Sequence, residues 1–294
     1  MKLLTYKYNG CETVGIVSAD GKAVIPLSAW GLRYPTMLAF LQEATDSEKL
    51  ILKKEEGREL SRIPIEQIEF MAPIPCPVQD VICLGINYME HAEESARYSN
   101  EAFGGERPYA VYFSKRVAEG VGHNQPIQGH FDLTERVDYE AELAVVIDND
   151  CKDVSEEDAY RYIFGYTILN DVSARDLQTR HKQWYFGKSL DGFTPMGPWI
   201  VTKDEVAFPP ALSIQSRVNG ELRQDSNTSK LIFGIPHIIA ELSRGMTLKA
   251  GTIIATGTPA GAGMGFTPPK FLKKGDVVEC TIEGIGTLRN PVGD

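Results

Sequence analysis

A long series of short β-rich runs constrains the fold of this chain more than any other feature. From residue 80 onward, runs rich in β-branched and aromatic residues are separated by turn residues; they read DVICLG, AVYFSK, ELAVVIDND, YTILND, PMGPWIVT, SIQSRVNGELRQ, GTIIATGTPAG and DVVECTIEGIGTLRN. In this part of the chain, helical spacing is found only around residues 87–103, 155–163, 173–184 and 235–245. Because strands and helices do not alternate regularly, a TIM barrel and a doubly wound sheet are excluded. We expect a β-dominated α+β body.

The first 72 residues predict a small α/β domain of their own. An Asp-Gly turn at Asp20-Gly21 lies between two apolar runs and predicts a hairpin, and residues 36–60 have helical spacing. Three prolines then alternate in MAPIPCPVQD (71–80), which favours extended backbone and excludes a helix. We place the boundary there, giving a small domain over 1–72 and a catalytic domain over 73–294.

Composition and net charge limit which partners the protein could bind and which cellular compartment it could occupy. The 294 residues carry a net charge of −10, which argues against nucleic acid and against an anionic membrane surface. No apolar run is long enough to span a bilayer, and the first residues do not resemble a signal peptide. The five cysteines are scattered without a CxxC pair, so we expect free thiols, a cytoplasmic protein and no thiolate zinc site.

The stretch DYEAELAVVI (138–147) brings acids unusually close together. Asp138, Glu140 and Glu142 are each two apart, so in a strand they share one face, with neighbouring Cβ atoms roughly 7 Å apart. Like charges beside an apolar run are costly to bury. Either this is a solvated strand end with surface ion pairs, or the two glutamates converge on a cation.

A further carboxylate follows the next apolar strand, YTILND (166–171). Asp171 would complete an all-oxygen, three-carboxylate set suited to Mg²⁺ or Mn²⁺, although Asp171 or Ser173 is alternatively a helix cap. Arg175 and Gln178 come four and seven residues after Asp171, so a helix would place all three on one face. Arg175 is then either near the metal carboxylates or a substrate acid, or in an ion pair with Asp171 or Asp176.

Three other segments carry candidate functional groups. His91 precedes Glu94 by three residues in a polar helical stretch that we expect to be exposed, where the pair is either an acid/base couple or a surface ion pair. Lys188, between glycine and serine, is a candidate anion-binding lysine. The turn around Thr258 in ATGTPAG (255–261) could hold a carboxylate oxygen through hydroxyl and N–H groups.

Together these stretches resemble the fumarylacetoacetate hydrolase (FAH) superfamily. From about residue 73 to 292 the motifs occur in the family's order, including CLGINYMEHAEE, DYEAELAVVI, GYTILNDVSARDLQ, GKSLDGFTPMGPWIV and GMTLKAGTIIATGTPAG. The final third is similar to bacterial acylpyruvate hydrolases and oxaloacetate decarboxylases. Two stretches depart from the pattern: Ile86 stands where many relatives carry arginine or lysine, and KRVAEGVG (115–122) replaces a stretch richer in proline and small residues.

The resemblance implies a fold, a metal and a set of roles. It implies the family's mixed β-roll or β-sandwich fold, and a homodimer. The implied site consists of Mg²⁺ or Mn²⁺ on Glu140, Glu142 and Asp171, catalytic His91, Glu94 and Lys188, and substrate-binding Arg175, Gln178 and Thr258. Asp138 belongs to the motif without being expected as a ligand.

The implied substrate is a small 2-oxo acid, whose carboxylate and keto oxygens can chelate a cation. We expect C–C cleavage through a metal-stabilised pyruvate enolate, either oxaloacetate decarboxylation or acylpyruvate hydrolysis. His91, backed by Glu94, would activate the water that hydrolysis needs. Isomerisation, hydration and tautomerisation share the enolate and stay open as alternatives, as does a metabolite-binding protein without catalysis.

Overall fold

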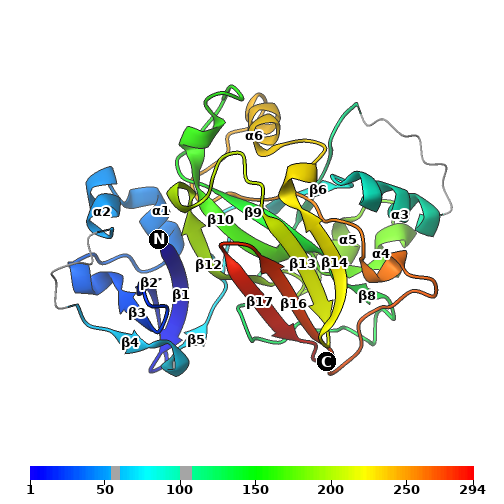
Figure 1. The fold of residues 1–294 in the computed structure, drawn as a ribbon, viewed down its shortest axis with the longest axis horizontal. Helices are drawn as coiled ribbons and strands as arrows, with labels where there is room; N and C mark the ends of the chain where they lie inside the picture. Colours follow the sequence, from blue (N-terminus) through cyan, green and yellow to red (C-terminus); the bar gives the residue numbers. More distant parts are fainter. Residues whose placement is uncertain (54–59, 100–107) are drawn as a thin grey trace.

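A computed structural model describes residues 1–53, 60–99 and 108–294 and shows two main sheets and one short two-stranded sheet (Figure 1). The large sheet has the order β4-β3-β2-β1-β12-β10-β9-β15-β6-β7, with β5 paired to β1. Its strands are β1 (Lys2–Tyr8), β2 (Cys11–Val17), β3 (Ala23–Pro26), β4 (Ile63–Pro64), β5 (Glu69–Phe70), β6 (Val81–Gly85), β7 (Val111–Lys115), β9 (Ala141–Ile147), β10 (Ile163–Asn170), β12 (Met196–Thr202) and β15 (Ile253–Ala255).

A four-stranded antiparallel sheet packs against the middle of the large one (Figure 1). It runs β14-β13-β16-β17 and contains β13 (Ser213–Val218), β14 (Glu221–Asn227), β16 (Val277–Ile282) and β17 (Gly286–Pro291). A short two-stranded pair joins β8 (Val137–Asp138) to β11 (Ser173–Ala174). This β-dominated architecture confirms the expected fold class.

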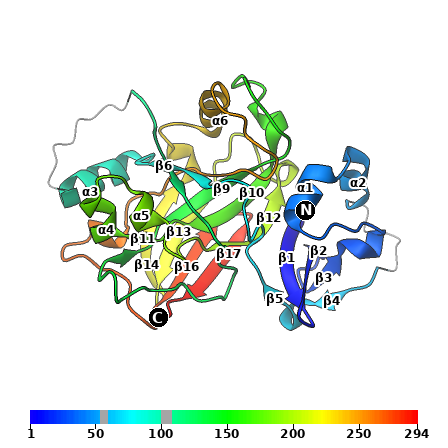
Figure 2. The same ribbon diagram turned by 180° about the vertical axis from the view of Figure 1, so that it is seen from behind.

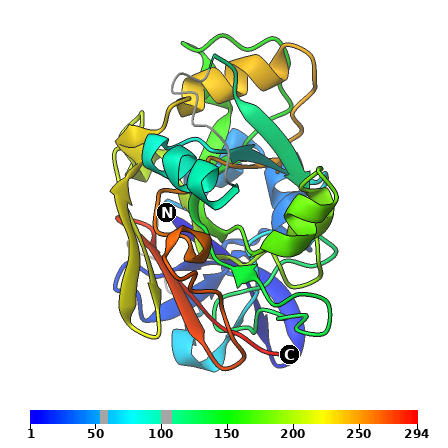
Figure 3. The same cartoon turned by 90° about the vertical axis from the view of Figure 1, so that its right-hand side faces the viewer.

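Few helices accompany the sheets, and three of them gather at one end. The α-helices are α1 (Met37–Glu43), α2 (Asp46–Ile51), α3 (Met89–Ser99), α4 (Arg175–Arg180), α5 (Tyr185–Lys188) and α6 (Ile235–Ser243). Single 3₁₀ turns are η1 (Leu27–Trp30), η2 (Ile65–Gln67), η3 (Ala159–Tyr162), η4 (Lys203–Glu205), η5 (Thr228–Lys230) and η6 (Gly263–Gly265). Figure 2 shows α3, α4 and α5 at the end of the molecule opposite the N-terminal strands, and in Figure 3 this end faces the viewer. No helix in the described ranges is long and apolar enough to cross a membrane.

The core explains why LAVVI is an unbroken apolar run. Leu143, Val145 and Ile147 of β9 belong to the core between the two sheets, whereas Ala144 and Val146 belong to a second cluster on the other face. A strand that is covered on both faces needs apolar residues at every position. Glu142 shares the face of Ala144 and Val146, so its carboxylate enters a buried environment.

The N-terminal strands continue the large sheet. The predicted hairpin is present as β2 and β3, and β1 pairs antiparallel with β12 through Lys2–Val201 and Leu3–Ile200. The sheet therefore crosses the predicted boundary at residue 72, and the division into domains 1–72 and 73–294 stays a prediction.

Several predicted helices are shorter than expected. The stretch 36–60 contains two short helices, α1 and α2, and its residues 54–59 lie outside the described residues. The stretch 155–163 forms only the 3₁₀ turn η3, whereas 235–245 contains α6 as predicted. The stretch 173–184 was expected to be one helix, but α4 ends at Arg180. The predicted cap at Asp171 or Ser173 is wrong, because the residue preceding α4 is Ala174, which makes no side-chain cap.

Candidate active site

One cluster contains every buried charged side chain in the part of the chain that the structure describes. Its members are five carboxylates, three cations and one histidine: Glu94, Asp138, Glu140, Glu142, Asp171, Lys115, Arg175, Lys188 and His91. Burying an isolated charge is costly, so a fold keeps such a cluster only where ions compensate one another. Five negative charges against three positive ones leave a formal excess of two negative charges when His91 is neutral.

Strand pairing brings the three predicted metal ligands together. Glu142 lies in β9, Glu140 directly precedes this strand, and Asp171 directly follows β10. Glu142 pairs with Leu169 across β9 and β10, and the Asp171 N–H donates to the Glu140 carbonyl at 2.9 Å. One carboxylate oxygen from each of the three acids lies within 4.8 Å of the others. The acids predicted from spacing therefore converge, in an all-oxygen set that suits a hard divalent cation.

The two glutamates of this set have opposite electrostatic environments. Burial, and then the negative charges of Asp171 and Glu140, raise the pKa of Glu142 well above its ordinary value. Its described hydrogen bond comes from the Gly257 N–H at 2.8 Å. Burial also acts to raise the pKa of Glu140, but Arg175 and Lys188 outweigh it and lower that pKa. Of these two glutamates, Glu142 is thus the one whose charge the protein compensates less.

Two buried lysines hold the acids in place, and the sequence predicted only one of them. The Lys188 ammonium lies 2.6 Å from Glu140 Oε2 and 2.6 Å from Asp171 Oδ2. The Lys115 ammonium lies 2.6 Å from Asp171 Oδ1 and 2.9 Å from the Val172 carbonyl. Burial lowers the pKa of Lys115, and the charge of Asp171 opposes this shift. Its one sequence signal was a lysine ending the apolar strand AVYFSK.

Arg175 lies beside one of the predicted metal carboxylates, which is one of its two expected positions. Its Nε donates to Asp138 at 2.9 Å and its Nη2 to Glu140 at 2.6 Å, so the alternative of an ion pair with Asp171 or Asp176 is wrong. Asp171 precedes α4 and points to the lysines, so it does not share a helical face with Arg175. Asp138 also accepts the N–H groups of Gly263 and Met264, at 2.6 and 3.0 Å, and so ties η6 to the site.

The helix α3 is not the exposed helix that its polar sequence predicted. His91, Ala92 and Glu94 are buried, and the remaining part of the predicted helix, residues 100–103, lies outside the described residues. His91 Nδ1 is 3.1 Å from Glu94 Oε2, and His91 Nε2 is 3.7 Å from Glu140 Oε1. Glu94 also accepts the Gly261 N–H at 3.0 Å. The His91–Glu94 pair therefore faces the carboxylates and is not a surface ion pair.

The remaining predicted substrate-binding residues lie at the same site. Gln178 Oε1 accepts a hydrogen bond from Arg175 Nη1 at 3.1 Å. The Thr258 hydroxyl donates to the Ala141 carbonyl at 2.9 Å and accepts from the Gln224 amide at 2.7 Å. In the 255–261 turn, the N–H of Gly257 binds the protein's own Glu142.

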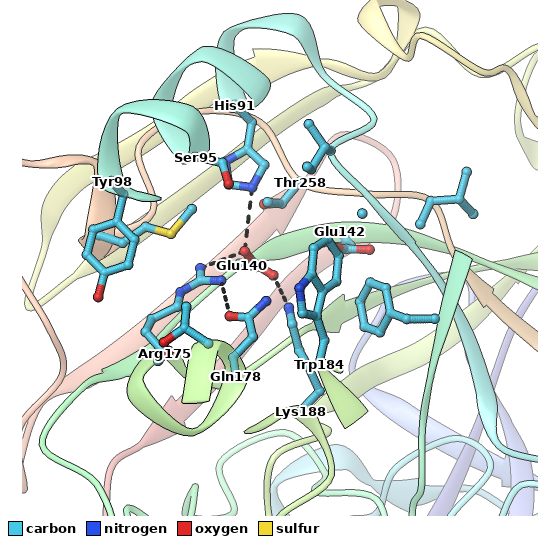
Figure 4. Close-up of a pocket in the computed structure, with 16 residues that line it drawn as sticks. His91, Ser95, Tyr98, Glu140, Glu142, Arg175, Gln178, Trp184, Lys188 and Thr258 are labelled. Carbon is cyan, nitrogen blue, oxygen red and sulfur yellow. Dashed lines mark hydrogen bonds and ion pairs between the residues drawn. The ribbon is translucent and has the colours of Figure 1, made fainter. Parts of the chain in front are cut away.

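A pocket opens on this cluster, with one polar and one apolar wall (Figure 4). The polar wall includes His91, Ser95 and Tyr98 of α3 and Arg175, Gln178 and Thr179 of α4. The apolar wall contains Leu84, Gly85, Ile86, Phe113 and Trp184. Ile86 has φ of +59°, a left-handed conformation that is rare for a β-branched residue and costs about 1–3 kcal/mol. Such strain is typical of functional sites and fixes the shape of this wall.

Comparison with known proteins agrees with this geometry. The family model described as fumarylacetoacetate (FAA) hydrolase C-terminal matches residues 80–293. The chain belongs to the fumarylacetoacetate hydrolase family. It is 50% identical over 229 residues to oxaloacetate tautomerase YisK from Bacillus subtilis, covering 78% of this chain and 74% of that protein. The family predicted from the motifs is thereby confirmed.

Two solved structures show the same fold over the whole chain. The fumarylacetoacetate hydrolase from Exiguobacterium antarcticum is 38% identical, with a TM-score of 0.81, and covers 100% of this chain and 99% of its own. The maleylpyruvate hydrolase from Sphingobium, solved with manganese and pyruvate, is 29% identical with a TM-score of 0.79 and the same coverage. The relatives thus include hydrolases and a tautomerase that act on keto acids.

Proposed function

We propose that this chain is a divalent-metal-dependent enzyme that interconverts the keto and enol forms of oxaloacetate. The observation that carries the proposal is the convergence of Glu140, Glu142 and Asp171 beside the His91–Glu94 pair in one pocket. The identity of 50% to an oxaloacetate tautomerase supports this reaction above the C–C cleavage that the motifs first suggested.

The residues fit a bound Mg²⁺ or Mn²⁺. Glu140, Glu142 and Asp171 would hold it, because their oxygens are close together and buried, and because Glu142 lacks a cationic partner among the described residues. A divalent cation would offset the two excess negative charges of the cluster. When bound, it supplies Lewis-acid stabilisation of negative charge on the substrate's keto oxygen.

The chain's own residues would move the protons. Tautomerisation removes the proton from the enol oxygen and places one on C3, and the reverse reaction does the opposite. His91 is the group to transfer a proton, because Nε2 faces the carboxylates and Nδ1 is fixed by Glu94. Lys188 adds positive charge next to Glu140 and Asp171, where the oxygens of the substrate would lie.

Cleavage of a C–C bond is the second candidate. The same His91–Glu94 pair suits activation of a water, and a structural relative that is a hydrolase contains manganese and pyruvate. Product analysis separates the two reactions, since tautomerisation retains all four carbons of oxaloacetate and decarboxylation releases CO₂ and pyruvate. A protein that binds oxalate with Mn²⁺ but converts no 2-oxo acid would be a binding protein and not an enzyme. The expected homodimer and cytoplasmic location stay predictions.

Replacing the proton-transfer group tests the proposal directly. We expect His91→Gln to lower kcat for loss of the enol form of oxaloacetate by about 10²- to 10⁴-fold, the usual contribution of a general acid–base. Mn²⁺ affinity should stay nearly unchanged, because His91 is not among the three ligands. The measurements are the decay of enol absorbance in the ultraviolet and a Mn²⁺ titration.

His237 provides the matched control. Its side chain is 40% exposed and pairs with Glu156 at the surface, so His237→Gln should leave kcat unchanged. Glu94→Gln should lower kcat in the same direction as His91→Gln. Full turnover by the His91 variant would exclude His91 as the proton-transfer group.

A further inference from the structure

The glycine-rich segment GAGMGF (261–266) contacts the carboxylate that orients His91. Its turn η6, orange in Figure 1, lies beside α3. The Gly261 N–H donates to both oxygens of the Glu94 carboxylate, at 3.0 and 3.3 Å. Glu94 Oε2 is in turn the described partner of His91 Nδ1. The segment is therefore one contact away from the group proposed to transfer a proton.

Two buried side chains hold this segment in place. The Tyr139 hydroxyl donates to the Gly261 carbonyl at 2.9 Å, and the Asp138 carboxylate accepts the N–H groups of Gly263 and Met264. Asp138 and Tyr139 are both fully buried. Because Glu140 follows them directly in sequence, the segment is anchored to the same stretch of backbone that carries a proposed metal ligand.

Gly265 approaches the side chain of Glu94 too closely for any other residue to fit without a shift. A Cβ added to Gly265 would overlap with Oε1, Cδ and Cγ of Glu94, which are the three atoms nearest to it. All three belong to the far end of a flexible side chain, and the φ of Gly265 is not left-handed. Alanine therefore fits the backbone at this position but displaces the carboxylate. Gly261 differs, because its φ is +103° and an added Cβ would meet the Arg223 carbonyl.

We propose that Gly265 is a positioning residue, whose missing side chain leaves the space in which the Glu94 carboxylate bridges Gly261 and His91. This inference rests on the proposed function, because it concerns the orientation of the proton-transfer group. The hydrogen bond at one ring nitrogen of a histidine sets the protonation and direction of the other. A displaced Glu94 would leave His91 Nδ1 without its described partner, so that Nε2 no longer has a fixed orientation toward the substrate.

Steady-state kinetics of a single variant test the proposal. We expect Gly265→Ala to lower kcat for loss of the enol form of oxaloacetate by about 100-fold, the cost of misplacing a reacting group by about 1 Å. KM and Mn²⁺ affinity should stay nearly unchanged, because Gly265 is not among the three proposed ligands and does not line the pocket. Gly245→Ala is the matched control, since Gly245 is exposed, an added Cβ would meet no atom within 4 Å, and kcat should not change.

A double variant separates this role from a general disturbance of the fold. Glu94→Ala removes the three atoms with which the added Cβ would overlap. In the Glu94→Ala background, Gly265→Ala should therefore cause no further loss of kcat, because the two substitutions act through the same contact. Losses that multiply in the double variant, or a wild-type kcat in Gly265→Ala alone, would overturn the role of Gly265.

A crystal structure of Gly265→Ala gives a readout that does not depend on turnover. We expect the Glu94 carboxylate to have left both the Gly261 N–H and His91 Nδ1, with the three proposed metal ligands in their wild-type positions. A carboxylate still bound to both groups would show that Gly265 does not position it. If the wild-type protein converts no 2-oxo acid, the proposed function fails, while this structure still decides whether Gly265 makes room for Glu94.

Discussion

Glu142→Gln is expected to lower metal-dependent turnover strongly and at the same time to stabilise the metal-free protein. Burial and the neighbouring charges of Asp171 and Glu140 raise the pKa of Glu142, so the folded protein disfavours its ionised form. Glutamine has nearly the same shape and still accepts the Gly257 N–H. Removing the charge should raise the Tm of the metal-free protein by about 2–4 °C, which corresponds to about 1 kcal/mol.

The same substitution removes one of three proposed ligands. Loss of a charged ligand should weaken Mn²⁺ binding at least about 100-fold, since even changes to groups behind the ligands cost 10- to 100-fold. Turnover of oxaloacetate should fall about 1000-fold, the loss of roughly 4 kcal/mol of transition-state stabilisation. Differential scanning calorimetry after EDTA treatment and a Mn²⁺ titration measure the two effects.

A surface glutamate provides the control for the loss of one negative charge anywhere in the protein. Glu156 is 54% exposed in its pair with His237, so Glu156→Gln should change neither Tm nor Mn²⁺ affinity appreciably. Unchanged Mn²⁺ binding in Glu142→Gln would show that the metal is held elsewhere. A lower Tm in the metal-free variant would show that the protein compensates the charge of Glu142 by itself.

Sequence spacing predicted that Glu140, Glu142 and Asp171 converge because their positions depend on local rules. Glu140 and Glu142 are two residues apart at the start of one strand, and Asp171 ends the next, so alternation and adjacent strand pairing suffice to bring them together. The position of Arg175 near Glu140 was among the expectations, but its contact with Asp138 was not, because Asp138 reaches it through the two-residue β8–β11 pair, which has no recognisable strand pattern. Lys115 was missed because nothing local shows that β7 ends beside Asp171, 56 residues away in sequence.

The burial of α3 was mispredicted for a different reason. Amphipathic analysis identifies a buried helix face by apolar residues, but the buried face of α3 presents His91 and Glu94. Such a face is stable only because the surface it covers is itself ionic, with Glu140 near His91 and the Gly261 N–H at Glu94. Polar residues on a buried helix face thus indicate the site, although from composition alone such residues are predicted to be solvent-exposed.

Lys115→Met is expected to destabilise the metal-free protein by about 3–5 kcal/mol, the cost of breaking a fully buried ion pair. The substitution leaves Asp171 next to two glutamates with Lys188 as its remaining cation, and it leaves the Val172 carbonyl without its ammonium donor. Urea unfolding of EDTA-treated protein measures the loss. Lys249→Met is the control, because its pair with Asp150 is about half exposed on both sides and should be worth less than about 1 kcal/mol.

A double-mutant cycle distinguishes the ion pair between Lys115 and Asp171 from the other contacts of Lys115. If charge imbalance dominates, Asp171→Asn should recover part of the stability lost in Lys115→Met, with a coupling energy of about 0.5–3 kcal/mol. Stability is recovered because position 171 is uncharged in the double variant. A buried amide costs much less free energy without a cationic partner than a buried carboxylate does. Strictly additive losses would mean that Lys115 stabilises the fold through its other contacts, such as the hydrogen bond to the Val172 carbonyl, and not through its ion pair with Asp171. Measurable coupling would identify Lys115 as the residue that allows an aspartate to exist at the end of β10 before any metal binds.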